Sequence, residues 1–284
     1  MKVVILGASG LLGTKLMDIL SVEHEVIGTY LNTPSKGLQI LDVTNKQKVE
    51  EFLRRESPDV VINTVALTSS VACERKPSLA KKLNYETAKN VSRVCQKLDA
   101  YLVFTSSSYV FDGKGGSYKE NERPHPINQY GETKVMAEKE VLNLQKGLIL
   151  RIDAIYGYNG KKKNNGILNN IFSNKQIFLG SPNQVRQPLL IDDLAGIIIS
   201  LVKKKQKGIF NIAGPDKLPM LNFIKKLEKL IRKESKISIL GEKNLLVKPL
   251  KNSTLDISKI NKLGIKTHSL KDGLNIVKQQ LISS

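Results

Sequence analysis

The chain has 284 residues, of which 40% are hydrophobic and 25% are charged. These are the values of a globular protein with a sizeable core, and they exclude disorder as the default. Lysine and arginine outnumber aspartate and glutamate by 45 to 26, which gives a formal net charge of +19 and raises the question of an anionic partner.

The positive charge is spread along the chain rather than gathered in one segment. Its tightest runs are the lysines at residues 161–163 and 203–205, and neither is interleaved with the aromatic side chains on which bases stack. We therefore expect a lysine-rich surface and no nucleic-acid partner, although the positive field would concentrate a phosphorylated substrate. No stretch approaches ~20 apolar residues, so we expect no membrane partner and a cytoplasmic protein.

The cysteines and histidines are not spaced like metal ligands. Cys73 and Cys95 lack a CxxC pattern, and His24, His125 and His268 have no mutual spacing typical of a metal site. We expect buried thiols in a reducing compartment and no metal.

Short apolar strands alternate with helices along the first half of the chain. Strands are predicted at residues 2–6, 24–30, 37–42 and 59–66 and from residue 101; helices are predicted from the first glycines to about residue 20 and at residues 46–56, 79–98 and 128–144. This alternation predicts a Rossmann-type α/β fold, a doubly wound parallel sheet with helices on both faces. Ligands of such sheets bind beyond the carboxyl ends of the strands.

Three glycines follow the first predicted strand and open the first helix. Gly7, Gly10 and Gly13 in GASGLLG lack side chains, so the turn can be tight and its backbone can approach a pyrophosphate. The amides at the helix N-terminus would meet the charge of that pyrophosphate. The position between a strand and a helix therefore predicts a dinucleotide-binding turn. Its other predicted members are Ser9, Leu11 and Leu12.

The alternation becomes irregular after Tyr156. Residues 157–166 are loop-like, and helices near residues 194–204, 221–233 and 269–281 are separated by short strands and turns. We predict an NAD(P)-binding domain over residues 1–157 and a smaller, mainly substrate-binding C-terminal lobe over residues 158–284. Residues 185–212 are expected to return to the first domain.

A tyrosine and a lysine lie four residues apart in NQYGETK. If this segment is helical, Tyr130 and Lys134 project from the same face, and the hydroxyls of TSSSYVFDG, residues 105–113, lie at the end of the strand that begins at residue 101. Reduction of a ketone by hydride transfer leaves negative charge on oxygen, so a proton donor and a hydrogen-bond donor are needed beside it. A lysine ammonium favours phenolate, so we expect it to lower the pKa of Tyr130.

The glycine spacing GxxGxxG resembles that of the extended short-chain dehydrogenase/reductase superfamily. YVFDG, followed about twenty residues later by YGETK, resembles one branch, the dTDP-4-dehydrorhamnose reductase family. Further landmarks of that family follow in the same order, so the resemblance covers nearly the whole chain. They are GSYKENERPHPINQYG, LRIDAIYG, RQPLLIDDLA, GIFNIAGPD and KPLKNSTLDISKINKLGI.

The resemblance implies roles for individual residues. It makes Ser107, Tyr130 and Lys134 the catalytic residues, with Lys134 also bonded to the nicotinamide ribose. Asp42 would face the adenine ring, and Asn84 would help to organise the site. The other residues implied to contact the cofactor are Val43, Asn63, Val65, Ala66 and Thr105.

The segment after the second predicted strand bears on the cofactor preference. Enzymes that prefer NAD usually carry an acidic residue there, which holds the ribose hydroxyls. The segment GTYLNTPSKG carries none. Asn32 and Lys36 would instead meet a 2′-phosphate, so NADP(H) is favoured over NAD(H).

The resemblance also implies the substrate, a nucleoside diphosphate carrying a 4-keto-6-deoxy sugar, and a possible homodimer. Ser107, Ser108 and Tyr109 are expected to contact the sugar. Arg186 and Lys248 are candidates to hold the diphosphate, and a plain surface charge stays open for each.

The sequence departs from the family at two places. Ser108 stands where the family often has an aspartate, and Ala154 and Ile155 stand where it often has an aromatic residue. The identity of the sugar nucleotide is therefore less fixed than the reaction.

Two other functions stay open. An epimerase or dehydratase of the same superfamily would share the catalytic residues and recycle a tightly bound NAD, although no Asp-Glu pair follows Ser107 as a dehydratase requires. The regulatory β-subunit of methionine adenosyltransferase resembles the same branch and works by binding a partner. The fold alone does not distinguish this role from catalysis, because function resides in the site.

Overall fold

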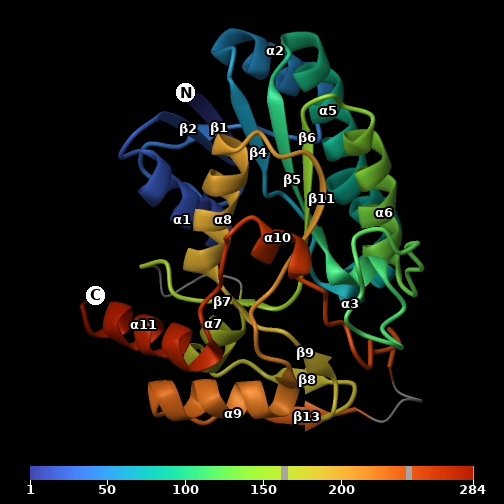
Figure 1. Ribbon diagram of the computed structural model, residues 1–284, viewed down its shortest axis with the longest axis vertical. Coiled ribbons are helices and arrows are strands. Elements are labelled where there is room, and N and C mark those ends of the chain that lie inside the picture. The colour runs from blue at the N-terminus through green and yellow to red at the C-terminus, as the bar shows by residue number, and fades with distance from the viewer. Residues whose placement is uncertain (161–165, 241–244, 284) are drawn as a thin grey trace.

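The computed structural model describes residues 1–160, 166–240 and 245–283, and its centre is a seven-stranded sheet (Figure 1). The strands lie in the order β11-β6-β5-β4-β1-β2-β3, and every neighbouring pair is parallel. They are β1 (Lys2–Leu6), β2 (Glu25–Tyr30), β3 (Gln39–Ile40), β4 (Val60–Asn63), β5 (Tyr101–Ser107), β6 (Gly147–Ile152) and β11 (Gly208–Ile212).

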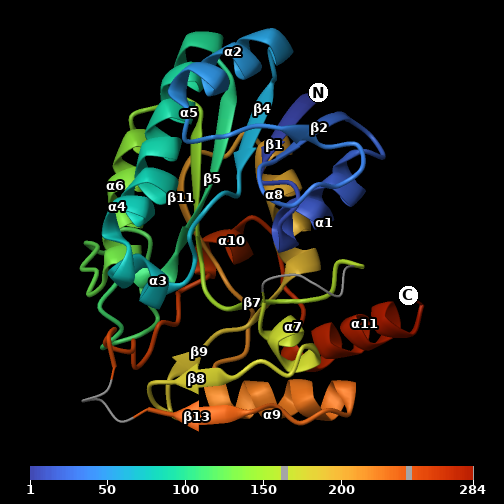
Figure 2. The same ribbon diagram turned by 180° about the vertical axis from the view of Figure 1, so that it is seen from behind.

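Helices cover both faces of this sheet, as Figures 1 and 2 show from opposite sides. On one face lie α1 (Leu11–Leu20) and α8 (Ile191–Lys203); on the other lie α2 (Lys46–Glu56), α5 (Thr87–Leu98) and α6 (Gln129–Leu142). The central strands β4, β5 and β6 are buried along their whole length, which explains their near-continuous apolar sequences. The predicted Rossmann-type fold is confirmed.

The chain between β4 and β5 departs from one regular helix. After α3 (Ser70–Arg75), a helical segment is made of α4 (Pro77–Ala80), the π-helical turn η1 (Lys81–Glu86) and α5. One helix was expected over residues 79–98. π-helical turns occur frequently at functional sites, and this one carries the buried Asn84.

A separate hydrophobic cluster lies below the sheet in Figure 1. It is formed by β7 (Ile155–Tyr156), α7 (Ile167–Phe172), β8 (Ile177–Leu179), α9 (Met220–Ile231) and α11 (Leu270–Ile282). Short pairings add β9 (Val185–Arg186), β10 (Leu189–Leu190), β12 (Leu218–Pro219) and β13 (Ile237–Ile239). The remaining elements are η2 (Ser108–Val110), directly after β5, and α10 (Ser258–Lys262), beside β11. The division into a cofactor domain and a substrate lobe stays a prediction.

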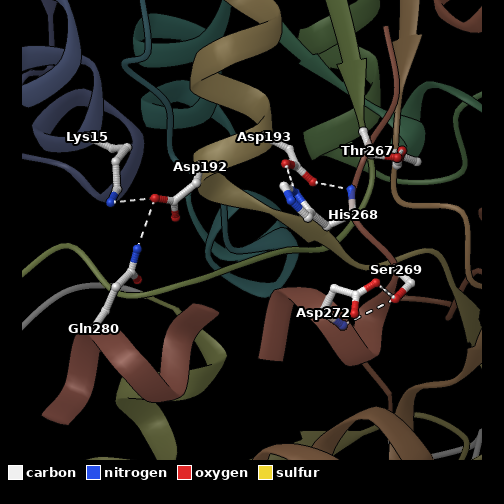
Figure 3. Close-up of polar contacts among 9 residues, drawn as sticks. Lys15, Asp192, Asp193, Thr267, His268, Ser269, Asp272 and Gln280 are labelled. Carbon is white, nitrogen blue, oxygen red and sulfur yellow. Dashed lines mark hydrogen bonds and ion pairs between the residues drawn. The ribbon is translucent and has the colours of Figure 1, made fainter. Parts of the chain in front are cut away.

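Polar contacts join this lower part to the helices beside the sheet (Figure 3). Asp192, in the first turn of α8, accepts hydrogen bonds from Lys15 of α1 at 2.8 Å and from Gln280 of α11 at 3.0 Å. The neighbouring Asp193 accepts from the backbone amide of His268 and contacts its Nδ1 at 2.6 Å. The helix that follows the glycine turn is therefore tied through α8 to the last helix of the chain.

The bounds of the predicted elements agree with the structure to different degrees. β1 and α2 have the predicted bounds, whereas the strand predicted at residues 59–66 ends at Asn63, whose side chain accepts a hydrogen bond from the amide of Val65 and turns the chain. The strand predicted at residues 37–42 is only Gln39–Ile40, because Gly37 has a φ of +80°.

Two further expectations concern single residue types. Cys73 and Cys95 are free and buried, as expected. The lysine run at residues 161–163 lies outside the described residues. Among the described helices, none has both the length and the apolar character needed to cross a membrane.

The first prediction concerns Gly13, in the first turn of α1. A Cβ at this position would lie 2.4 Å from the carbonyl oxygen of Gly7 and 2.6 Å from Cα of Ala8, both parts of the backbone. We expect Gly13→Ala to lower the free energy of unfolding by about 1–3 kcal/mol, because the helix must shift away from the turn. Urea unfolding measures this change.

Gly196→Ala is the matched control. Gly196 lies inside α8, and a Cβ there would meet nothing within 4 Å. We expect this variant to gain about 0.4–1 kcal/mol through the lower conformational entropy of its unfolded chain. Equal effects of the two substitutions would contradict the close packing of α1 on the glycine turn.

Candidate active site

The carboxyl ends of β1, β4 and β5 meet at one edge of the sheet. These strands are neighbours, and their register pairs Leu6 with Asn63 and Asn63 with Phe104. The glycine turn, the NTVA loop and the TSSS segment each leave the sheet at this edge. Parallel pairing thus brings together three segments that the sequence holds far apart.

The glycine turn packs closely against neighbouring segments, which leaves no room for a side chain at Gly7 or Gly13. Gly7 has a φ of +82°, and a Cβ there would lie 2.9 Å from Oγ1 of Thr64. Gly10 is the N-cap of α1 and provides no side-chain cap. The amides of the first turn of this ten-residue helix are therefore not competed for by a capping side chain, as the binding of a pyrophosphate requires. Ser9, Leu11 and Leu12 lie in the same turn, and Leu11 also lines a small cavity beside β7 and α7.

The loop after β4 is fixed by buried asparagines. Asn63 is 1% exposed, and its carbonyl oxygen accepts a hydrogen bond from Thr105 of β5 at 3.2 Å. Asn84 accepts from the amide of Leu67 at 2.7 Å and donates to Thr133 of α6 at 3.1 Å. Asn84 thus connects this loop to the helix that carries the predicted catalytic residues. Val65 and Ala66, in the loop that follows Asn63, are half-buried.

The residues predicted around the adenosine half lie at the ends of β2 and β3. Asn32 and Lys36 are exposed in the loop after β2. Asp42 accepts hydrogen bonds from the hydroxyl and the amide of Thr44, which lower the pKa of its carboxyl group. Val43 is buried against the α2 and α5 face of the sheet, so only its backbone faces the loop.

Ser107, Tyr130 and Lys134 are brought together by β5 and α6. The side-chain hydroxyl of Ser107 interacts with the phenol of Tyr130 and accepts a hydrogen bond from the amide of Tyr109 at 3.2 Å. Lys134 Nζ donates to the carbonyl oxygen of Thr105 at 2.9 Å and lies 5.9 Å from the ring centroid of Tyr130. The lysine is 1% exposed, so its ammonium group is held between the strand and the helix.

Burial dominates the protonation of this group. It raises the pKa of Tyr130, and the interaction with the Ser107 hydroxyl opposes that rise. This differs from the expected lowering by Lys134, because desolvation of the phenol has the largest influence on its pKa and the neighbouring Tyr109 and Cys73 raise the pKa further. Burial lowers the pKa of Lys134 to about 8, against the influence of Glu138. A protonated tyrosine suits the role of proton donor.

Gly131 has a structural role between the tyrosine and the lysine. A Cβ at this position would lie 2.1 Å from the carbonyl oxygen of Tyr109. The absence of a side chain therefore lets α6 approach the segment that follows Ser107. Asn128 begins the helix, and its side chain accepts a hydrogen bond from the amide of Gly131 at 2.9 Å.

Arg186, in β9, is directed toward Tyr109. It is 6% exposed, its guanidinium lies 5.7 Å from the ring centroid of Tyr109, and that ring meets Tyr130 edge-on at 5.5 Å. Nη1 donates to Oγ of Ser253 at 2.7 Å, and Nη2 donates to Oε1 of Gln184 at 3.2 Å. The structure therefore makes Arg186 a buried cation beside Tyr109 rather than a surface charge.

Ser108 does not share the exposure of its neighbour Tyr109. It is 1% exposed, and its hydroxyl donates to Oδ1 of Asp153 at 2.8 Å. The same carboxylate accepts from the hydroxyl of Ser253 at 2.7 Å and from the amide of Gln187 at 2.7 Å. Ser108, which stands where the resemblance expects an aspartate, thus bonds the carboxylate of Asp153, just after β6.

The remaining predicted substrate residue, Lys248, differs from this group in exposure. Lys248 is exposed, in the segment that leads to Leu250. Leu250 itself accepts a hydrogen bond from Arg186 through its carbonyl oxygen at 3.3 Å. The two candidate diphosphate ligands are therefore different in kind, one buried and one at the surface.

The sequence analysis missed three buried charges near the site. Arg151 and Glu138 form an ion pair at 2.8 Å with side chains 2% and 3% exposed, and Asp153 lies two residues after Arg151. A signal for them existed, because a central strand of a parallel sheet is expected to be apolar throughout. Charged residues in and directly after GLILRI indicate internal partners.

The family model described as RmlD substrate binding domain matches residues 1–282. The chain belongs to this family. A solved structure of a hypothetical dTDP-4-dehydrorhamnose reductase from Sulfolobus tokodaii is 31% identical, with a TM-score of 0.83 over 96% of this chain and 99% of that one. The dTDP-4-dehydrorhamnose reductase of Bacillus anthracis, solved in complex with NADP, is 25% identical, with a TM-score of 0.85 over 98% and 99%.

A different kind of relative is also similar. Methionine adenosyltransferase 2 subunit beta of Xenopus laevis is 29% identical over 228 residues, which are 76% of this chain and 68% of that protein. The comparisons confirm the predicted family and the class of NAD(P)-dependent oxidoreductase, and they support a nucleotide-sugar reductase over the alternatives.

The second prediction tests Asp153, whose carboxylate joins three parts of this RmlD-family chain. In Asp153→Ala the donors from Ser108, Ser253 and Gln187 lose their acceptor in a buried place. We expect the free energy of unfolding to fall by at least about 2 kcal/mol, because buried unsatisfied donors are costly. The measurement is urea denaturation followed by circular dichroism.

The control is Asp18→Ala, which removes a carboxylate from the exposed face of α1. We expect its effect to stay within about 0.5 kcal/mol. If Asp153→Ala were as mild as this control, Asp153 would not be the centre of the network.

Proposed function

We propose that this protein reduces the 4-keto group of a nucleotide-linked deoxy sugar with NADPH as the electron donor. The single observation that carries the proposal is the arrangement of Ser107, Tyr130 and Lys134 at the edge of the sheet that also holds the glycine turn. A proton donor and a nicotinamide site at one edge are what the reduction of a ketone requires.

The cofactor, when bound, supplies a hydride to the carbonyl carbon of the sugar. Ser107 donates a hydrogen bond to the carbonyl oxygen and orients it. Tyr130 transfers its phenolic proton to that oxygen as negative charge develops there, so the products are an alcohol and a phenolate. Lys134 stabilises the phenolate by its charge and, as the family resemblance implies, would bond the nicotinamide ribose.

The substrate is held by groups on the other side of the tyrosine. Arg186 lies beside Tyr109 and brings a guanidinium that suits a diphosphate oxygen, while Lys248 offers a mobile point charge at the surface. Tyr109 contributes an aromatic face between Arg186 and Tyr130. Ser108 acts through Asp153 and so shapes the site rather than touching the sugar.

The relative that is a methionine adenosyltransferase subunit makes a regulatory role the second candidate. The serine, tyrosine and lysine of this chain favour catalysis, because binding a partner protein does not need them. The proposal also includes a homodimer and a cytoplasmic location. Light scattering on the purified protein measures the oligomeric state.

The third prediction concerns Tyr130→Phe. With a 4-keto-6-deoxy sugar nucleotide and NADPH, we expect turnover to fall at least ~10²-fold, because the proton donor is lost while the ring and its packing stay. The loss of absorbance of the reduced nicotinamide measures turnover, and fluorescence titration measures NADPH binding, which we expect to be nearly unchanged.

Tyr85→Phe is the matched control, because Tyr85 is partly buried and bonds Glu140 away from the site. We expect it to keep normal turnover. Wild-type protein that binds NADPH but oxidises none with any keto-sugar nucleotide, and that co-purifies with a synthetase, would favour the regulatory role. Near-normal turnover of Tyr130→Phe would rule out the proposed proton donor.

The fourth prediction concerns the preference for NADP over NAD. Lys36 is exposed in the loop after β2, where the 2′-phosphate of NADPH would lie. We expect Lys36→Ala to raise the KM for NADPH about tenfold through loss of a charge-assisted contact, and to leave the KM for NADH unchanged. Steady-state kinetics with both cofactors give these values.

Lys271→Ala, which removes an exposed lysine from α11, is the control for the change in net charge. We expect the same KM values as in the wild-type protein. A wild-type preference for NADH would overturn the assignment of Asn32 and Lys36.

A further inference from the structure

A buried carboxylate lies one helical turn beyond the predicted catalytic lysine. Glu138 follows Lys134 by four residues on α6, so both side chains project from the same face of the helix. Glu138 is 2% exposed and Lys134 is 1% exposed. Removing an ionisable group from water costs free energy. Two such groups on one buried helical face are therefore expected to have compensating partners or a function.

Glu138 is held by partners from both neighbouring strands. Its Oε1 accepts from the hydroxyl of Ser106 of β5 at 2.6 Å and from Nε of Arg151 of β6 at 3.0 Å, and its Oε2 accepts from Nη2 of Arg151 at 2.8 Å. Arg151 in turn donates to the carbonyl oxygen of Glu120 at 3.2 Å and stacks on Phe111. The carboxylate therefore joins α6 to the strand that carries Ser107.

Lys134 is bound from the opposite direction. Its Nζ donates to the carbonyl oxygen of Thr105 at 2.9 Å and lies 4.8 Å from the ring centroid of Phe104. Ser106, which holds Glu138, lies between Thr105 and Ser107 in the strand. Strand β5 thus fixes the lysine through the backbone carbonyl of Thr105 and the carboxylate through the side chain of Ser106.

We propose that Glu138 is a positioning residue for the proposed reduction: fixed by Arg151 and Ser106, it keeps Lys134 in its ammonium form beside Tyr130. This inference deepens the proposed function and rests on it. Glu138 does not touch substrate or cofactor and acts only through the lysine. The groups whose charges act on Lys134 are Glu138 on its own helix and Cys73 of α3, with Tyr130 in contact through its ring and Arg151 facing Glu138 from β6.

The sign of the effect follows from the charges. Burial lowers the pKa of Lys134 to about 8, and the negative charge of Glu138 raises it. Without this carboxylate the lysine loses its proton at a lower pH, so less of the protein is in the active form at neutral pH. A structural tie alone would change stability and leave the protonation of Lys134 where it is.

The fifth prediction uses Glu138→Gln, which keeps the shape of the side chain and removes its charge. We expect the alkaline limb of the kcat/KM profile, near pH 8 in the wild-type protein, to move down by about one pH unit. Above the limb this is an approximately tenfold loss of kcat/KM. NMR titration of the protein with isotope-labelled lysine should give the same shift for Lys134, whose resonance is identified by its absence in Lys134→Met.

A second variant guards against misfolding, because Glu138→Gln leaves Arg151 buried without its partner. The double variant Glu138→Gln with Arg151→Met removes both charges, a replacement that buried ion pairs often tolerate. It should also shift the titration of Lys134 downward, by less. Glu140→Gln is the matched control, because Glu140 lies on the same helix and faces Tyr85 and Lys89 instead; its limb should not move.

The two readouts separate the two proposals. A lower pKa of Lys134 by NMR in folded Glu138→Gln or in the double variant supports the inference, whether or not reductase activity is found. An unchanged Lys134 titration in both, or an equal shift in Glu140→Gln, overturns it. Absence of any NADPH oxidation by the wild-type protein would overturn the proposed function alone.

Discussion

The parallel pairing of β5 with β4 and β6 is the constraint on which the candidate site depends. β5 is buried along all seven residues, and its last three, Thr105 to Ser107, each bond a different partner. Thr105 reaches the end of β4 through its hydroxyl and Lys134 through its carbonyl oxygen. Because successive side chains of a strand point to opposite faces, the strand contacts the end of β4 and helix α6 at once.

The buried ion pair of Arg151 and Glu138 lies beside this strand and is costly to desolvate. An ion pair with side chains 2% and 3% exposed, such as Arg151 with Glu138, often contributes no net stability, since desolvation offsets the attraction. Its geometry is nevertheless complete, with two hydrogen bonds between the pair and others to Ser106 and the backbone of Glu120. A buried pair of this kind suggests an effect other than stability, and Lys134 is a titratable group on the same buried face of α6, one helical turn from Glu138.

Features formed by residues close together in the sequence were predicted, whereas features formed by distant residues were missed. The glycine turn, α2 and the spacing of Tyr130 and Lys134 are local patterns, and each was predictable from a window of a few residues. The Asp153 network joins residues 108, 153, 187 and 253, so no local pattern carries it. The raised pKa of Tyr130 was missed for the same reason, because burial depends on what α3, η2 and the loop after β4 place around the phenol.

The same network connects the C-terminal part of the chain to the segments at the edge of the sheet. Ser253 belongs to the C-terminal segment, yet its hydroxyl lies between Asp153 beside β6 and Arg186 of β9. On the other side, Asp192 joins Lys15 of α1 to Gln280 of α11. Directional hydrogen bonds, unlike apolar contacts, fail when one partner moves by an ångström or two. Two such connections, Asp153–Ser253–Arg186 and Lys15–Asp192–Gln280, therefore fix C-terminal segments of the chain against the elements beside the sheet.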